Sequence, residues 1–277
     1  MNTVLDPELK AIHNAALNLY NRETLLIKSH PTSTVSINAT HFLAGQANVF
    51  ADSALFLMED PRQPLNPAAA LLRTCLEAQA RANHIIAVAG EEREQRANEF
   101  LTLMNVGYEY YETMVIQMTK DFAPDASNSL PRDLPYLPAI KRLVEESTDT
   151  SNLNALKKQY NQMNSNWSYV KVIGREKFLD PTWQNRSEAQ RLQPELYLRY
   201  VQLCAFVHSN PASLKLAPLL SPLSVGYIAV MAELAAVLCF FVALGKEKDQ
   251  DLLNLKTNLI AFNVNEKILP SKDLPPS

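Results

Sequence analysis

The fold is decided by one apolar stretch, VGYIAVMAELAAVLCFFVALG, which covers residues 225–245. It is about as long as a membrane span. Glu233 lies near its middle, however, and a carboxylate at the centre of a bilayer is costly. No cluster of Lys or Arg precedes the stretch to mark a cytoplasmic flank. We therefore interpret residues 225–244 as the buried central helix of a soluble protein, and we expect no membrane association.

Composition supports an ordinary globular chain that is rich in helices. Of the 277 residues, 47% are hydrophobic and 20% are charged, which is typical of folded soluble domains. The 6 glycines are few for a sheet protein, because sheets use glycine in turns and bulges. The net charge of −3 gives no basic excess that would indicate nucleic-acid binding.

The cysteines and the first residues indicate the cellular compartment in which the protein is located. Cys75, Cys204 and Cys239 form no CxxC pair, and their odd number argues against a disulfide framework. Free cysteines in apolar segments suit a reducing compartment. The sequence begins without a basic segment followed by an apolar run, so we see no signal peptide. These features together predict a cytoplasmic protein.

Capping residues, prolines and apolar spacing predict helices along the rest of the chain. Asp6-Pro7 and Asn66-Pro67 each place Pro at the first position of a helix. Ser224 is expected to cap the central helix, and Tyr169–Ile173 is expected to be a short extended piece. The predicted helices cover residues 7–30, 36–58, 67–90, 91–122, 141–146, 153–163, 187–208 and 252–262. We expect an all-α fold, a multi-helix bundle in a single helical domain over residues 1–265, with a disordered tail over 266–277.

A second stretch, LLRTCLEAQARANHII at residues 71–86, carries the densest set of reactive side chains. At about 100° per residue, Arg73, Glu77, Arg81 and His84 share one side of a helix. Two interpretations are open. The stripe is either a solvated face with ordinary helix ion pairs, or one wall of an internal cavity. We expect the Arg73–Glu77 pair to support structure more than chemistry.

Two further residues join this stripe in a predicted polar centre. His208 shares a narrow helical arc with apolar residues and is expected to point inward, either as a core or capping histidine or as part of a site. Glu233, alone among apolar neighbours, must pair with a base or take up a proton. Its expected partner is Arg73, Arg81 or His208. The predicted centre therefore consists of Arg73, Glu77, Arg81, Tyr200, His208 and Glu233.

Several kinds of chemistry find no support in the sequence. It contains no glycine-rich phosphate loop and no GxSxG nucleophile turn. The five histidines are not spaced at i, i+4, and no HExxH motif is present. We therefore predict neither a metal nor a cofactor.

Four short motifs carry a resemblance to a known family. They are Leu72-Arg73-x2-Leu76-Glu77, Arg96-x3-Phe100, Trp183-x2-Arg186 and Tyr200-x3-Cys204-x3-His208. Over roughly residues 66–212 the chain resembles a widespread bacterial helical family of unknown function, which has Ser where this chain has Cys204. The resemblance implies an all-helical bundle and no particular activity. More distantly, such proteins resemble the HEPN ribonucleases of toxin and antiphage systems, whose Arg-x4–6-His motif is replaced here by Arg199-x8-His208.

Two functions remain open at this point. The first is a non-enzymatic module that binds a protein partner or a small ligand through its internal polar cluster. The alternative is a metal-independent ribonuclease in which His208 acts as acid or base and Arg73 stabilises phosphate charge. RNA is a partner only in the second case. Assembly into a homo-oligomer is compatible with both.

Overall fold

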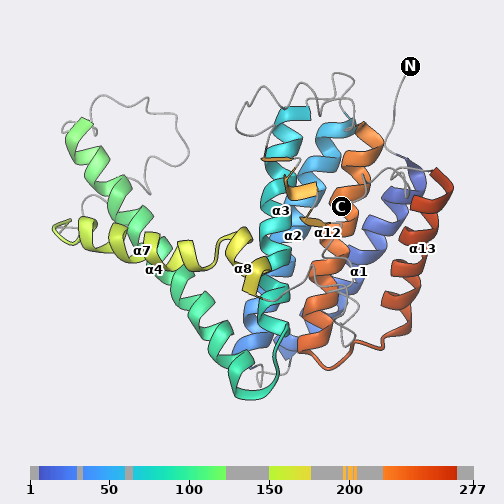
Figure 1. Ribbon diagram of the computed structural model, residues 1–277, viewed down its shortest axis with the longest axis horizontal. Helices are drawn as coiled ribbons and strands as arrows, with labels where there is room; N and C mark the ends of the chain where they lie inside the picture. The colour runs from blue at the N-terminus through green and yellow to red at the C-terminus, as the bar shows by residue number, and fades with distance from the viewer. Residues whose placement is uncertain are drawn as a thin grey trace. The chain divides into compact units, whose positions relative to one another are not determined.

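A computed structural model describes residues 6–29, 34–59, 65–122, 150–175 and 221–266, together with 196–197, 199–201 and 203–204. Every regular element in these residues is a helix, and none is a strand (Figure 1). The all-α prediction is therefore confirmed. The bounds are α1 Pro7–Ser29, α2 Val35–Glu59, α3 Leu65–Ile86, α4 Gly90–Phe122, α7 Leu153–Asn166, α8 Tyr169–Arg175, α12 Pro222–Ala243 and α13 Gln250–Glu266.

The chain divides into two compact units, one formed by residues 1–98 and 169–277 and the other by residues 99–168. A single domain over residues 1–265 stays a prediction. The predicted helix over 141–146, most of the helix over 187–208, and residues 267–277 of the predicted tail lie outside the described residues.

The first unit is built around α12, which packs against α1, α2, α3 and α13 (Figure 1). Every residue from Ser224 to Phe241 is buried. A helix that is apolar on all sides must be covered on all sides. The predicted central helix is thus confirmed. In the described part of the chain α12 is also the one helix long and apolar enough to cross a membrane, and nearly all of its apolar window lies inside the protein.

The start of α12 corrects one detail of the sequence analysis. The N-cap is Ser221, one turn before the expected Ser224. The Ser221 hydroxyl accepts a hydrogen bond from the Ser224 backbone amide at 3.1 Å, and the Ser224 hydroxyl accepts one from the Ser221 amide at 2.8 Å. Pro222 is compatible with the first helical position, so the helix begins earlier and Ser224 completes a capping box.

The expected extended piece at Tyr169–Ile173 is also wrong, because these residues form α8. Tyr169, Val172 and Ile173 are buried, whereas Val170 and Lys171 are exposed. Buried positions at i, i+3 and i+4 are the helical pattern. The β-branched composition of the segment, which favours strands, is overridden by the packing of α8 on α3.

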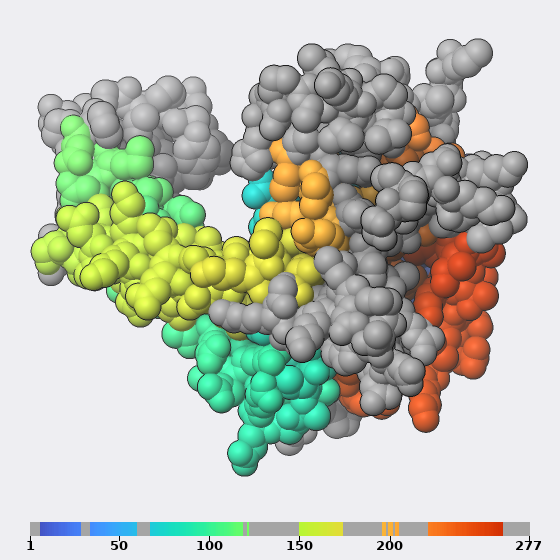
Figure 2. All heavy atoms as spheres, viewed as in Figure 1, coloured from blue at the N-terminus to red at the C-terminus, as the bar shows by residue number. Residues whose placement is uncertain are grey.

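Helix α13 closes the first unit on one side. It packs on α1 and α12 through Leu252, Leu259 and Phe262, which are almost completely buried. The other side of α13 is exposed, for example at Asp251, Asn254 and Asn258 (α13 is red in Figure 2). The predicted amphipathic helix over 252–262 is therefore confirmed, with bounds that extend to Gln250 and Glu266.

In the described part of the second unit, the later part of α4 packs against α7. Tyr160 of α7 stacks on Tyr110 and meets Tyr111 edge-on, each with ring centroids 5.5 Å apart. A Cβ added to Gly107 would lie 3.0 Å from the ring of Tyr160, so this glycine allows the close approach of the two helices. Farther along, Phe100 packs on the indole ring of Trp167.

Candidate functional site

Glu233, at the centre of α12, is completely buried and pairs with a histidine. Its Oε2 atom lies 2.7 Å from Nδ1 of His13 on α1, and the His13 side chain is itself 6% exposed. A buried carboxylate requires such a partner. The expected partners Arg73 and Arg81 are wrong, because the ion pair that the structure describes for Glu233 is with His13. His208, the third expected partner, lies outside the described residues.

The pair is poised to hold a proton near neutral pH. Burial raises the pKa of Glu233 from an ordinary value of 4.5 to about 7, although the hydrogen bond and charge of His13 act to lower it. Burial alone would lower the pKa of His13, but the hydrogen bonds and charges of Glu233 and Asp52 outweigh it and raise the pKa. Two groups this close share protons as one unit.

The other side of His13 faces an open pocket. Its Nε2 atom lies 3.3 Å from a carboxylate oxygen of Asp52 on α2, whose side chain is 72% exposed. The pocket has a volume of about 370 Å³. We call it the His13 pocket, and its lining comprises Lys10, His13, Asn14, Asp52, Ser53, Leu55, Phe56, Leu57, Glu59 and Leu71. His13 thus connects a carboxylate at the surface with one in the core.

Further buried polar atoms lie on α12 and on two helices that pack against it, α2 and α3. The amide of Asn48, one turn before Asp52 on α2, and Oε1 of Glu233 are buried and have no hydrogen-bond partner among the described residues. The Cys75 thiol donates to the carbonyl of Ala47 at 3.4 Å, and burial together with the charge of Glu233 raises its pKa well above the usual range. Burial and the charge of Asp52 thus oppose ionisation of Glu233, whereas His13 favours it.

The structure brings Arg73, Glu77 and Tyr200 of the predicted centre together. One carboxylate oxygen of Glu77 accepts from Nε of Arg73 at 3.1 Å and from the Tyr200 hydroxyl at 3.2 Å. The Arg73 guanidinium lies 5.6 Å from the centroid of the Tyr200 ring. Burial and the charge of Glu77 raise the pKa of Tyr200. This Arg73 cluster satisfies its own charges, which is the arrangement expected of a pair that supports structure.

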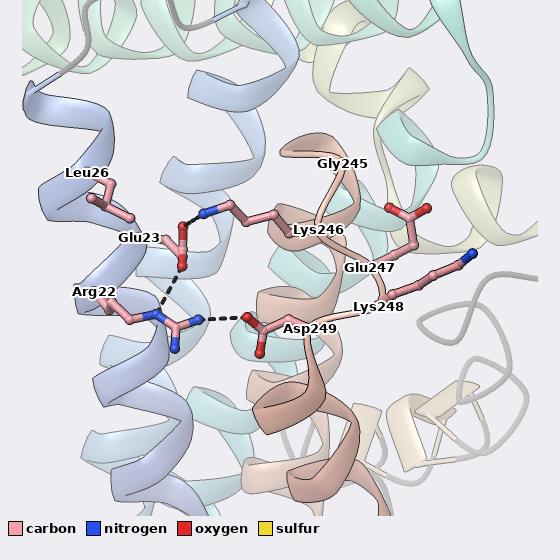
Figure 3. A pocket seen from close by; sticks show the side chains of 8 residues that line it. All are labelled: Arg22, Glu23, Leu26, Gly245, Lys246, Glu247, Lys248 and Asp249. Atoms are coloured by element: carbon pink, nitrogen blue, oxygen red, sulfur yellow. Dashed lines mark hydrogen bonds and ion pairs between the residues drawn. The ribbon is translucent and has the colours of Figure 1, made fainter.

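A third polar group joins α1 to the turn after α12 (Figure 3). Glu23 is buried and accepts from Arg22 at 3.0 Å and from Lys246 at 2.5 Å. Arg22 also contacts Asp249 at 2.8 Å. A shallow pocket of about 620 Å³ lies beside these residues, but the charges that face one another there already pair, so we interpret the group as a clamp between helices.

Neither His13 nor Glu23 was found from the sequence. Both belong to the buried stripe of α1, which also contains Leu9, Ile12, Ala16 and Leu19. Their spacing within this stripe is the signal that was available, since positions i, i+3, i+4 and i+7 face one way on a helix. Among the described residues, no group of three or more His, Cys, Asp or Glu side chains is placed to hold a metal ion.

The fold and the site define an all-helical protein in which one member of a buried His–carboxylate pair, His13, lines a pocket. Compared with protein-family models, with curated proteins and with solved structures, the chain matches none. Membership of the bacterial helical family thus stays a prediction, and the function is argued from the geometry of the site.

Proposed function

We propose that this protein is a binding module for a small ligand that carries a positive charge and occupies the His13 pocket. The observation that carries the proposal is the exposed carboxylate of Asp52, held 3.3 Å from a histidine whose far side is fixed by a buried carboxylate. A pocket with a few convergent polar groups and shifted pKa values is the usual form of a ligand site.

The charges around the pocket favour a cation. Lys10 and Glu59 form an ion pair at 2.6 Å and cancel each other. His13 and Glu233 together carry no net charge when one proton lies between them. The negative charge of Asp52 is then left without a balancing positive charge. Among the described residues, His13 is the one basic side chain that pairs with Asp52. Because the Asp52 side chain is 72% exposed, water screens the attraction, and a ligand cation would gain on the order of 1 kcal/mol from it.

The apolar wall next to Asp52 suggests the rest of the ligand. Phe56 lies one helical turn after Asp52 and is 73% exposed. An aromatic face beside a carboxylate favours an ammonium group through both charge and cation–π attraction. Leu57 and Leu71 extend the apolar lining. The pocket therefore suits an amine with a short hydrocarbon body.

The experiment is an NMR titration of the whole chain with n-butylamine, n-butanol and butyrate, monitored at the His13 imidazole. We expect saturable shifts with butylamine, in the millimolar range that suits so small a probe. Asp52→Asn should abolish them. Asp121→Asn, which removes a carboxylate from α4, is the matched control and should leave them unchanged. Equal binding of butyrate, or binding retained in Asp52→Asn, would contradict the proposal.

The ribonuclease alternative stays a prediction. Its proposed acid or base, His208, lies outside the described residues, and its phosphate-binding residue, Arg73, contacts Glu77. Incubation of total RNA with the protein and with a His208→Ala variant separates the two functions, since only the ribonuclease would lose cleavage in the variant. The cytoplasmic location and the absence of membrane association likewise stay predictions.

A further inference from the structure

Asp52, His13 and Glu233 form a chain of polar contacts that leads from the surface to the centre of the first unit. The Asp52 side chain is exposed, the His13 side chain is nearly buried, and the Glu233 side chain is completely buried. His13 uses both ring nitrogens, with Nε2 at 3.3 Å from Asp52 and Nδ1 at 2.7 Å from Glu233. A change at the exposed carboxylate therefore reaches the buried carboxylate through one imidazole ring.

These two contacts determine where the protons of the chain lie. A lone pair on Nδ1 would repel a carboxylate lone pair at 2.7 Å, so one proton lies between His13 and Glu233. Nε2 faces the Asp52 carboxylate and, for the same reason, carries a second proton. With both protons in place, the three side chains have a net charge of −1. Burial lowers the pKa of His13, but the contacts with Glu233 and Asp52 outweigh burial and raise it, which agrees with this assignment.

Other titratable groups lie on the helices around the chain. Lys10 of α1 and Glu59 of α2 line the same pocket and pair with each other at 2.6 Å. Cys75 of α3 is buried, and burial raises the pKa of its thiol well above the usual range, so the thiol keeps its proton near neutral pH. Lys256 of α13 is partly buried, and burial lowers its pKa. A Glu233→Gln variant leaves all four groups in place and so separates their titration from that of the chain.

We propose that the His13 pocket exchanges a proton for an organic ammonium ion, because binding of the ammonium group at Asp52 displaces the Nε2 proton of His13 into solvent. This inference rests on the function proposed above. The ammonium group replaces Nε2–H as the partner of Asp52, and its positive charge opposes the positive charge of the ring. The proton between Nδ1 and Glu233 stays. One positive charge enters and one leaves, so the site and its ligand together keep the net charge of −1.

The exchange couples affinity to pH. By linkage, the ammonium ion and the proton weaken each other's binding by the same factor. The titration of Glu233, with a pKa of about 7, places the coupling near neutral pH. A coupling of about tenfold centred on pH 7, within the usual range for linked sites, releases about half a proton for each amine bound. Constant net charge also spares the buried Glu233 carboxylate an additional charge beside it.

The test is isothermal titration calorimetry of the full chain with n-butylamine at pH 7, in phosphate and in Tris. Tris takes up a proton with a much larger heat than phosphate, so proton release appears as a difference between the two binding enthalpies. The amine stays protonated at pH 7, as a Lys side chain does, and the released proton therefore comes from the protein. We expect about half a proton per amine.

The possible failures of this experiment differ from one another. Equal binding enthalpies in phosphate and Tris, with saturable shifts of the His13 imidazole in the NMR titration, would overturn the exchange and leave amine binding intact. The lack of any saturable shift with butylamine would refute the proposed function, and the exchange with it. Both results come from the wild type and require no variant to fold.

Glu233→Gln tests the route through His13. Without the contacts of Glu233, burial keeps His13 neutral at pH 7, and the ring has no proton to release. We expect the enthalpy difference between the two buffers to disappear in this variant, with circular dichroism to verify that the helices persist. Glu91→Gln removes an exposed carboxylate from the first turn of α4 and should release as much proton as the wild type. Release that persists in folded Glu233→Gln would refute the route through His13.

Discussion

Replacement of Glu233 by Gln should change how stability depends on pH. The native pKa of Glu233 is raised from 4.5 to about 7. A raised native pKa means that the folded protein binds the proton more tightly. The stabilisation is therefore fully present below pH 4.5 and is lost as the pH rises through about 7. A shift of this size corresponds to roughly 3 kcal/mol, at about 1.4 kcal/mol per pKa unit. The raised pKa of His13 likewise stabilises the folded protein at low pH, and this stabilisation is also lost as the pH rises.

The assay is urea unfolding of the wild type and of Glu233→Gln at several pH values from 4.5 to 8. We expect the wild type to lose roughly 3 kcal/mol relative to the variant across this range. Because Gln cannot titrate but keeps the shape of Glu, the difference reports the protons that Glu233 and His13 bind as a coupled pair. Glu91→Gln, on the exposed first turn of α4, controls for the loss of a carboxylate. A difference between wild type and Glu233→Gln that is flat from pH 4.5 to 8 would refute the reasoning.

Three further outcomes follow from the same structure. Tetramethylammonium should bind the His13 pocket more tightly at pH 8 than at pH 5.5, because loss of the Glu233 proton makes the site more negative, and Glu233→Gln should remove this dependence in an NMR titration. A double-mutant cycle on Arg73→Ala and Glu77→Ala should give a coupling of about 1 kcal/mol, above the 0.2–0.5 kcal/mol of an exposed helix pair, and near-zero coupling would reject a structural pair. Ser221→Ala should destabilise by about 1 kcal/mol in thermal unfolding through loss of the capping box.

The fold could be predicted because its main signals are local. The apolar stretch of α12 requires burial on all sides whatever surrounds it. Asp6 marks the start of α1 because its carboxylate accepts from the Glu8 amide, and Pro7 suits the first helical position. One error arose where a local preference met tertiary packing, at the β-branched run in α8. The other, the choice of Ser224 over Ser221 as the cap, was local, because the capping box and Pro222 that place the cap at Ser221 lie within the same few residues.

The candidate site was only partly predictable, for a different reason. Arg73 and Glu77 lie one turn apart, so their contact follows from helix geometry. Burial of Glu233 and its need for a base also followed from its neighbours. The identity of that base did not, because His13 and Glu233 are 220 residues apart and nothing in either segment indicates the other. In the sequence of α1, moreover, His13 is a polar residue within an apolar stripe, and such a residue does not by itself indicate a buried functional group.

The central position of α12 has a consequence for the order in which the protein can assemble. Helices α1, α2 and α3 bury their apolar faces against a helix that the ribosome synthesises only after residue 221. During translation these apolar faces are therefore exposed to water or contact one another. The contact between His13 of α1 and Glu233 cannot form until most of the chain has left the ribosome. Nascent chains that stall before α12 would expose the apolar surfaces on which chaperones act and from which aggregation starts. The first unit can therefore complete its folding only after α12 has been synthesised.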